Sequence, residues 1–267
     1  MKKYYFLHAA PRSGNTVFSA LLNQNPKINV TANSLVTDIM KAIVVGKDST
    51  MFQNFPDEKS FDNVLKSIFN NYYKDWKADI IIDRSPVGWQ KNFDLVSKYV
   101  EPNFKCVVLI RDLFDIFASY LKWADNSSNC FLNEGNLPTE KKIEKIMHPD
   151  GLIYQSLLGI SNLYNYYHEN TLFIYYKEFV ENPQKEISRL YNFFDLKSFQ
   201  HNFENISSFE VNGIKYRDEI YGDNMHTIQS NLFTFDETSD IQKYRNMIPK
   251  KIYEQYQEVN EWVTKVR

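Results

Sequence analysis

The sequence predicts an α/β fold of three layers, α/β/α, in which helices cover both faces of a central, mostly parallel β-sheet. Short apolar runs alternate along the chain with longer amphipathic stretches, which is the order expected of βαβ units. The apolar runs are mostly continuous, as is typical of strands that are buried on both faces. With 267 residues and 43% hydrophobic content, the chain can bury one large core, so we expect residues 1–267 to form a single domain.

Four runs of β-branched, aromatic and other apolar residues predict the strands of this sheet, at 4–9, 79–82, 105–110 and 171–175. Amphipathic stretches predict helices at 16–23, 34–44, 61–76, 90–99, 113–124, 151–169, 183–194 and 249–266. Residues 126–150 and 207–240 are polar and show neither the apolar runs of strands nor the amphipathic pattern of helices. Loops of such length in a compact domain are usually functional. We therefore expect the first to form a flap over a site and the second to form a functional loop.

The composition excludes several classes of protein. A formal net charge of −2 argues against non-specific binding of nucleic acid, which needs a broad positive field. His8 and Arg12 follow the first apolar residues too soon for a secretory signal, and no run approaches the roughly 20 apolar residues of a membrane span. Cys106 and Cys130 form neither a metal-binding spacing nor a disulfide framework. These observations lead us to expect a soluble, cytoplasmic protein.

The strongest local motif lies between the first predicted strand and the first predicted helix. It reads Pro11-Arg12-Ser13-Gly14-Asn15-Thr16, which we call the phosphate loop. Backbone N–H groups of a tight turn at a helix N-terminus can hold a phosphate, and glycine allows the anion to approach closely. The hydroxyl groups of Ser13 and Thr16 and the guanidinium of Arg12 can add further contacts. The alternative is an ordinary turn in which Ser13 or Asn15 caps the helix.

A second basic residue ends the third predicted strand. Arg111 follows the apolar run 105–110, and Ser119 lies eight positions later in the next predicted helix. Arg111 would then lie at the carboxyl edge of the sheet, where ligands bind in open α/β folds. The alternative is that Arg111 forms a surface salt bridge with Asp112 or Asp115.

An acid and a base follow the second predicted strand. Asp83 and Arg84 come at the end of the run 79–82 and precede a chain-turning proline. The alternative here is a structural pair of Asp83 and Arg84 that orders the loop. The Gly-x-x-x-x-Gly-Lys-Ser/Thr pattern of magnesium-dependent NTPases is absent from the sequence, which argues against that class of enzyme.

These motifs resemble those of the sulfotransferases that use 3′-phosphoadenosine 5′-phosphosulfate (PAPS), and most closely those of the tyrosyl-protein, glycan and microbial types. The family's phosphate loop reads Pro-Lys/Arg-Ser-Gly-Thr/Ser-Thr, from which Asn15 departs. A strand-terminal arginine and a serine eight residues later bind the 3′-phosphate, and a basic residue before Ser/Asp-Pro lies by the transferred group. The resemblance implies a P-loop NTPase-like fold and the following site: Arg12, Ser13, Gly14, Asn15 and Thr16 at the 5′-phosphosulfate, Arg111 and Ser119 at the 3′-phosphate, and Arg84 at the sulfonate.

Sulfuryl transfer to a hydroxyl also needs a general base that removes the acceptor proton. The Lys-x-His segment of cytosolic sulfotransferases is not recognisable here. Glycan and tyrosyl-protein enzymes use a glutamate some twenty residues after the phosphate loop, and the nearest acid in this chain, Asp38, comes a few residues late. His226 lies in the segment 221–230, which resembles the late cofactor-covering loop of tyrosyl-protein-type enzymes. The candidates for the base are therefore Asp38, Asp83 and His226.

The resemblance implies transfer from PAPS to a hydroxyl or amine acceptor, with adenosine 3′,5′-bisphosphate (PAP) released. A sulfuryl group carries less negative charge than a phosphoryl group, so arginine and backbone donors can stabilise it, and we expect no metal. Carbohydrate, lipid, small phenol and peptide tyrosine all remain open as acceptors. Two other functions stay possible: a nucleotide or small-molecule kinase with a degenerate phosphate loop, and a nucleotide-binding protein that has lost its base. The oligomeric state is not readable from the sequence.

Overall fold

The computed structural model of the chain describes residues 2–128, 130–220, 226, 228, 233 and 240–266. Its strands are β1 (Lys3–Ala9), β2 (Ile28–Val30), β3 (Ile80–Asp83), β4 (Cys106–Ile110), β5 (Thr171–Tyr175), β6 (Glu210–Val211) and β7 (Ile214–Lys215). Its α-helices are α1 (Asn15–Leu22), α2 (Val36–Val45), α3 (Thr50–Asn54), α4 (Glu58–Tyr72), α5 (Gln90–Tyr99), α6 (Leu113–Asn126), α7 (Thr139–Ile146), α8 (Leu152–Tyr167), α9 (Tyr176–Glu181), α10 (Pro183–Phe193), α11 (Asp240–Arg245) and α12 (Lys250–Val263).

Strands β1 to β5 form one parallel sheet in the order β2-β3-β1-β4-β5. The first strand of the chain is thus the central one, and its Phe6 is aligned with Asp83 of β3 on one side and Cys106 of β4 on the other. Because all five strands run in the same direction, their carboxyl ends meet at one edge. This architecture confirms the predicted α/β fold.

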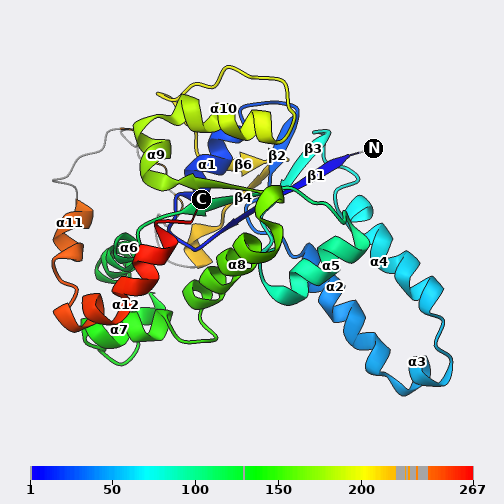
Figure 1. Ribbon diagram of the computed structural model, residues 1–267, viewed down its shortest axis with the longest axis horizontal. Coiled ribbons are helices and arrows are strands. Elements are labelled where there is room, and N and C mark those ends of the chain that lie inside the picture. The colour runs from blue at the N-terminus through cyan, green and yellow to red at the C-terminus, as the bar shows by residue number, and fades with distance from the viewer. Residues whose placement is uncertain are drawn as a thin grey trace.

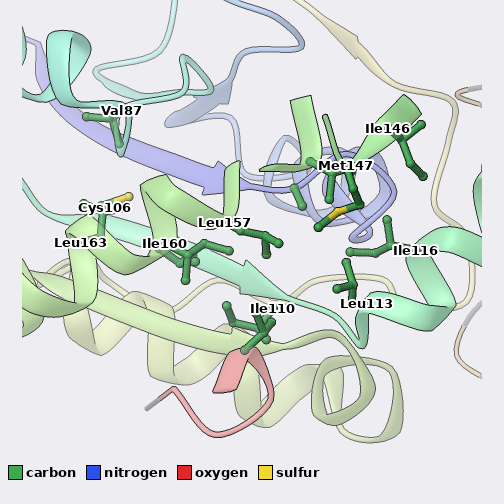
Figure 2. Close-up of a cluster of buried hydrophobic side chains, with 14 of the residues drawn as sticks. Val87, Cys106, Ile110, Leu113, Ile116, Ile146, Met147, Leu157, Ile160 and Leu163 are labelled. Atoms are coloured by element: carbon green, nitrogen blue, oxygen red, sulfur yellow. The ribbon is translucent and has the colours of Figure 1, made fainter. Parts of the chain in front are cut away.

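Helices cover both faces of the sheet because the strands are apolar on both sides (Figure 1). On β1, Phe6 enters the larger core, which is completed by α2, α4, α5, α6, α8 and α12, whereas Leu7 enters the smaller core under α1, α9 and α10. Figure 2 shows part of the larger core, where Leu157 and Ile160 of α8 lie beside Ile110 of β4. Alternate side chains of a strand point to opposite faces, so β1, β3, β4 and β5 each contribute to both cores, whereas Ile28 and Val30 of the edge strand β2 both enter the smaller one.

Several short elements lie outside the ranges predicted from the sequence: strands β2, β6 and β7 and helices α3, α7, α9 and α11. Strand β2 is only three residues long, too short for a period to be detected. Helix α7 lies within the segment 126–150 and is short, with only Ile143 and Ile146 buried. Strands β6 and β7 form a hairpin within the segment 207–240, and its turn residues Asn212 and Gly213 both have positive φ angles, 52° and 75°. The Asn-Gly pair is a known hairpin signal, so this element was readable from the sequence.

Helices α2 and α4 extend from the sheet toward α3, which lies at their outer end (Figure 1). The carboxyl end of α4 returns to the sheet, where Tyr73 is fully buried beside β3. Across the described part of the chain, no helix combines the length and apolar character needed to cross a bilayer.

Candidate active site

The carboxyl edge of the sheet gathers polar residues from four strand ends. Arg12 follows β1, Thr31 follows β2, Arg84 follows β3 and Arg111 follows β4. Parallel strands bring these positions to one edge although up to 99 positions of sequence separate them. The edge is therefore rich in positive charge.

The phosphate loop has the backbone of an anion cradle. Arg12 and Gly14 both have positive φ angles, 69° and 88°, and α1 begins at the next residue, Asn15. No side chain caps the start of α1, so its first N–H groups face the loop without an intrahelical partner. The predicted alternative, a turn capped by Ser13 or Asn15, is therefore wrong, and the geometry is that of an anion site at a helix N-terminus.

Position 14 requires glycine for two independent reasons. Its φ of 88° lies in the left-handed region, and a Cβ atom there would lie 2.5 Å from the ring of Tyr176, the residue after β5. Ser13 is buried, and its Oγ has no hydrogen-bond partner among the described residues; the same is true of Asn15 Oδ1. The Ser13 hydroxyl can donate to an anion bound at the helix N-terminus, which would satisfy it; Asn15 Oδ1 is an acceptor and needs a donor instead. Thr16 occupies the first turn of α1.

Arg111 is held against the phosphate loop and not in a surface salt bridge. Its Nη1 donates to the backbone oxygen of Arg12 at 2.8 Å, and its guanidinium lies 4.5 Å from the ring centroid of Tyr176. The two carboxylates that the sequence offered as alternative partners, Asp112 and Asp115, both pair with Arg245. The Nε of Arg111 is buried and has no partner within the described chain. Arg111 is thus positioned to accept an anion from the open edge of the sheet.

Ser119 connects the two predicted anion sites. It lies on the buried side of α6, and its Oγ accepts a hydrogen bond of 2.9 Å from Nε of Arg12. Burial lowers the pKa of Arg12, and the neighbouring charge of Arg111 lowers it further. Two guanidiniums are therefore kept close together at this edge, an arrangement that a doubly negative ligand would stabilise.

Arg84 and Asp83 point into different surroundings, so they do not form the structural pair considered from the sequence. Arg84 Nη1 donates to the hydroxyl of Tyr216 at 3.1 Å, and its backbone N–H donates to Thr31 Oγ1 at 2.8 Å. The carboxylate of Asp83 is fully buried and accepts hydrogen bonds from the hydroxyl of Tyr73 and from the backbone N–H of Ser85. Both oxygens of Asp83 are engaged, and its geometry is that of a residue that orders the loop after β3.

Asp38 lies apart from these residues, on an exposed face of α2. Its side chain is 54% exposed and forms an ion pair of 2.6 Å with Lys41, one turn later on the same helix. Within the described chain, no recorded contact joins Asp38 to the strand ends. The structure therefore does not bring this candidate base to the carboxyl edge.

His226, in contrast, lies near the strand ends, beside Tyr216, which contacts Arg84. Its ring stacks on Tyr216, with centroids 3.6 Å apart and 3° between the planes, and its Nδ1 is hydrogen-bonded to the carboxylate of Asp218. Burial lowers the pKa of His226, the hydrogen bond to Asp218 raises it, and the charges of Arg84 and Arg12 lower it again. Most of the predicted covering loop, residues 221–230, lies outside the described residues, and only positions 226 and 228 of it are described.

Sequence reasoning missed four residues of this site: Thr31, Tyr176, Tyr216 and Asp218. Tyr176 and Thr31 follow strands β5 and β2, so the rule that ligands bind at carboxyl strand ends could have found them once these strands were assigned. Tyr216 and Asp218 lie in an irregular segment, and no local pattern marks them. Their place beside Arg84 and His226 depends on the tertiary fold.

The comparisons with known proteins agree with this geometry. Residues 5–201, well over half of the chain, match the model of the Sulfotransferase family. Three sulfotransferases are among the solved structures that share the fold. A mouse sulfotransferase complexed with PAP has a TM-score of 0.59 at 13% identity, over 100% of this chain and 90% of its own. The sulfotransferase domain of the curacin biosynthetic pathway has a TM-score of 0.54 at 12% identity, over 92% of this chain and 97% of its own.

The third is the sulfotransferase domain of the Synechococcus PCC 7002 olefin synthase, with a TM-score of 0.53 at 12% identity, over 93% of this chain and 98% of its own. No curated protein matches the chain by sequence. The family match spans the phosphate loop, Arg84, Arg111 and Ser119, the residues whose spacing suggested the resemblance. The chain therefore belongs to the sulfotransferase family, and it has the P-loop NTPase-like α/β fold of that family.

Proposed function

We propose that this sulfotransferase takes the sulfuryl group from PAPS, passes it to an acceptor and releases PAP, with residues 1–267 acting as one domain. The observation that carries the proposal is the joined anion site. The uncapped start of α1 and the unpartnered Ser13 hydroxyl lie next to the guanidiniums of Arg12 and Arg111. Arg111 donates to the backbone oxygen of Arg12, and the Arg12 side chain donates to Ser119. A nucleotide with phosphate on both its 5′ and 3′ positions needs two adjacent anion sites, and a single phosphate loop would serve one.

The roles follow from position. The N–H groups of Gly14, Asn15 and Thr16, with the Ser13 hydroxyl, bind the 5′-phosphosulfate. Arg111 and Ser119 bind the 3′-phosphate. Arg12 contacts both Arg111 and Ser119, so it lies between the 3′-phosphate and the 5′-phosphosulfate. Arg84 approaches from β3 and stabilises the sulfonate as negative charge shifts onto the leaving phosphate.

His226 is the base that the geometry favours over Asp83 and Asp38. The hydrogen bond from Nδ1 to Asp218 places the proton on Nδ1 and leaves the Nε2 lone pair to accept the acceptor's proton. Burial and the two nearby arginines keep the pKa of His226 low, so the ring is neutral and able to act as a base. As the acceptor oxygen bonds to sulfur, its proton passes to Nε2, the bond from sulfur to the bridging oxygen breaks, and PAP leaves with the electron pair.

The reaction in this proposal needs no metal, because the guanidiniums and backbone N–H groups supply the positive charge at both phosphates. We also propose that the enzyme acts in the cytoplasm. Its two cysteines, Cys106 and Cys130, are both buried and unpaired, as expected of a protein kept in a reducing compartment.

Calorimetric titration with PAP, with and without EDTA, tests the donor. We expect binding that does not depend on metal and that weakens at least tenfold in Arg111→Ala, since a hydrogen bond to a charged group contributes about 1.5–3 kcal/mol. The matched control is Lys250→Ala, which removes one positive charge from an exposed position on α12 and should leave the affinity unchanged. A preference for ATP with magnesium would identify the kinase instead. Binding of PAP without transfer to any acceptor would identify the nucleotide-binding protein.

A further inference from the structure

Two carboxylates lie close to the residues that we assign to the 3′-phosphate. Asp112 follows Arg111 directly in the chain, and Asp115 lies one turn further along, in the first turn of α6. Residues four positions apart are neighbours on the surface of a helix, so Asp115 also lies next to Ser119. A phosphate bound at Arg111 and Ser119 would be repelled by both carboxylates if their charges were left uncompensated.

Arg245, on α11, compensates these two charges at once. Its Nη1 lies 3.0 Å from Oδ1 of Asp112 and donates a hydrogen bond to Oδ1 of Asp115, so a single guanidinium bridges the two carboxylates. The side chains of Arg245, Asp112 and Asp115 are only 27%, 26% and 29% exposed. Water and salt therefore screen the bridge less than they would screen an ion pair on the open surface.

The bridge is built into the packing of three helices. The hydroxyl of Tyr253, on α12, donates to the backbone oxygen of Arg245 at 3.1 Å. Asn260, one helical face further along α12, accepts a hydrogen bond of 2.6 Å from the N–H of Leu113 and donates one of 2.9 Å to Oδ2 of Asp112. Helices α11 and α12 thus both lie against α6 (Figure 1), and they fix Arg245 at its first turn.

The two carboxylates differ in what else holds them. Asp112 caps α6, because its Oδ1 accepts from the N–H groups of Phe114 and Asp115, and its Oδ2 accepts from Asn260. For the Asp115 carboxylate, the partner recorded within the described chain is Arg245. Loss of the Arg245 guanidinium would therefore leave Asp112 in place and release Asp115.

We propose that Arg245 is a positioning residue for the 3′-phosphate site, because it binds the carboxylates that would otherwise compete with the phosphate for Arg111. Without Arg245, the Asp115 carboxylate would either pair with Arg111 or remain as an uncompensated charge beside Ser119. Both states weaken the binding of a phosphate. Arg245 itself need not touch the donor. This inference rests on the proposed function, since it takes Arg111 and Ser119 as the residues that bind the 3′-phosphate.

A comparison of PAP with adenosine 5′-phosphate (AMP) tests this role, because the two nucleotides differ only in the 3′-phosphate. Both are titrated calorimetrically into the unmodified enzyme and into Arg245→Gln. We expect PAP to bind about tenfold more weakly to the variant, which is the effect of losing one hydrogen bond to a charged group, and AMP to bind with unchanged affinity. A general disturbance of the fold would weaken both nucleotides alike. Equal losses, or unchanged binding of PAP, would overturn the proposal.

Removal of the released carboxylate should restore the affinity. In the double variant Arg245→Gln and Asp115→Asn, no charge at position 115 is left to compete, and we expect PAP to bind within about threefold of the unmodified enzyme. A purely structural role of Arg245 predicts no recovery, since the double variant still lacks the bridge, and an absence of recovery would count against the proposal. The matched control is Lys251→Gln, at the other end of α12. It removes a positive charge and frees Glu140, its partner at 2.8 Å, and it should leave the affinity for both nucleotides unchanged.

The two proposals can fail separately. If the unmodified enzyme binds PAP no more tightly than AMP, the donor assignment is wrong and the role of Arg245 falls with it. If the unmodified enzyme prefers PAP and Arg245→Gln keeps the whole of that preference, the donor assignment stands and the role of Arg245 is wrong.

Discussion

At the scale of single residues, the Ser119 hydroxyl can fill two roles at once in the proposed site. Its oxygen accepts from Arg12 Nε at 2.9 Å, and its own hydrogen remains available for a phosphate oxygen. A hydroxyl can do both simultaneously, so the guanidinium of Arg12 need not move when the 3′-phosphate arrives. The Arg12 side chain is thus oriented before the donor binds, and such preorganisation lowers the entropic cost of binding.

Asp218 is the residue whose removal tests the assignment of His226. Its carboxylate raises the pKa of His226, against the lowering by burial and by Arg84 and Arg12. In Asp218→Asn the pKa of His226 should therefore fall, so the acidic limb of the kcat/KM profile should move to lower pH. The amide no longer fixes the proton on Nδ1, and we expect kcat to fall by about 10–100-fold. Measurement of sulfuryl transfer across pH in both proteins checks the two effects.

The control for this variant is Asp150→Asn. Asp150 lies 3.6 Å from Nδ1 of His148 in an exposed pair, so its exchange removes a carboxylate from beside a histidine that has no place in the proposed site. Its profile should match that of the unmodified enzyme. An acidic limb that stays in place, or moves to higher pH, in Asp218→Asn would exclude His226 as the base.

At the scale of elements, glycines let α8 pack closely on two neighbours: Gly159 lies against His8 of β1, and it also meets Gly88 in the loop between β3 and α5. A Cβ atom on Gly159 would lie 2.5 Å from His8 Nε2 and 3.1 Å from the carbonyl carbon of Gly88. A Cβ atom on Gly88 would lie 2.5 Å from the backbone oxygen of Gly159. The absence of a side chain at Gly159 lets α8 approach β1, and its absence at Gly88 lets α8 approach the loop after β3.

Gly159→Ala should consequently destabilise the protein although alanine favours helices. The added methyl group forces the buried His8 ring away from its hydrogen bond with the backbone oxygen of Ser156, and we expect the free energy of unfolding to fall by about 1–3 kcal/mol. Urea denaturation measures this change. Gly46→Ala is the matched control, because its nearest neighbour would be a ring atom of Phe61 at 3.9 Å, and it should be neutral or slightly stabilising. Equal effects of the two exchanges would show that the close approach of α8 does not limit stability.

At the scale of the whole molecule, His8 makes stability depend on pH. Complete burial lowers the pKa of His8 to about 4, from 6.5 for an unperturbed histidine. The unfolded chain binds a proton below pH 6.5, whereas the folded chain resists it, so the contribution of His8 is fully present above pH 6.5 and is lost as the pH falls toward 4. The full shift corresponds to about 3 kcal/mol, of which about 2 kcal/mol should be lost by pH 5.

Replacement of His8 by glutamine tests this dependence. The amide of His8→Gln can still donate to the backbone oxygen of Ser156 but does not titrate, so its free energy of unfolding should fall less between pH 7.5 and pH 5 than that of the unmodified protein, by about 2 kcal/mol. His148→Gln replaces an exposed histidine and should keep the original pH dependence. Parallel curves for His8→Gln and the unmodified protein would rule out His8 as the source.

The sequence could predict those parts of the molecule that depend on local pattern. Strands buried on both faces are continuous apolar runs, and the phosphate loop is contiguous in sequence, so four of the five strands of the sheet and the phosphate loop at Gly14 could be predicted, whereas the three-residue β2 could not. The strand order was not, because nothing in the sequence indicates that β3 inserts between β1 and β2. Asp83 and Asp38 were plausible bases by their positions in the sequence. The fold, however, buries the Asp83 carboxylate against Tyr73 and Ser85 and leaves that of Asp38 facing solvent. Burial and hydrogen-bond partners of this kind depend on the tertiary structure and cannot be predicted from local sequence.

The distance along the chain between interacting residues affects the order in which parts of the enzyme fold. The sheet is complete once Tyr175 has been added, and with it the cradle of the phosphate loop and Arg111. Tyr216, which holds Arg84, lies 132 positions after its partner, and contacts of such separation form late because a long loop must first be closed. During synthesis on the ribosome, a nascent chain that has folded its sheet would therefore form the nucleotide-binding loop before Tyr216 contacts Arg84.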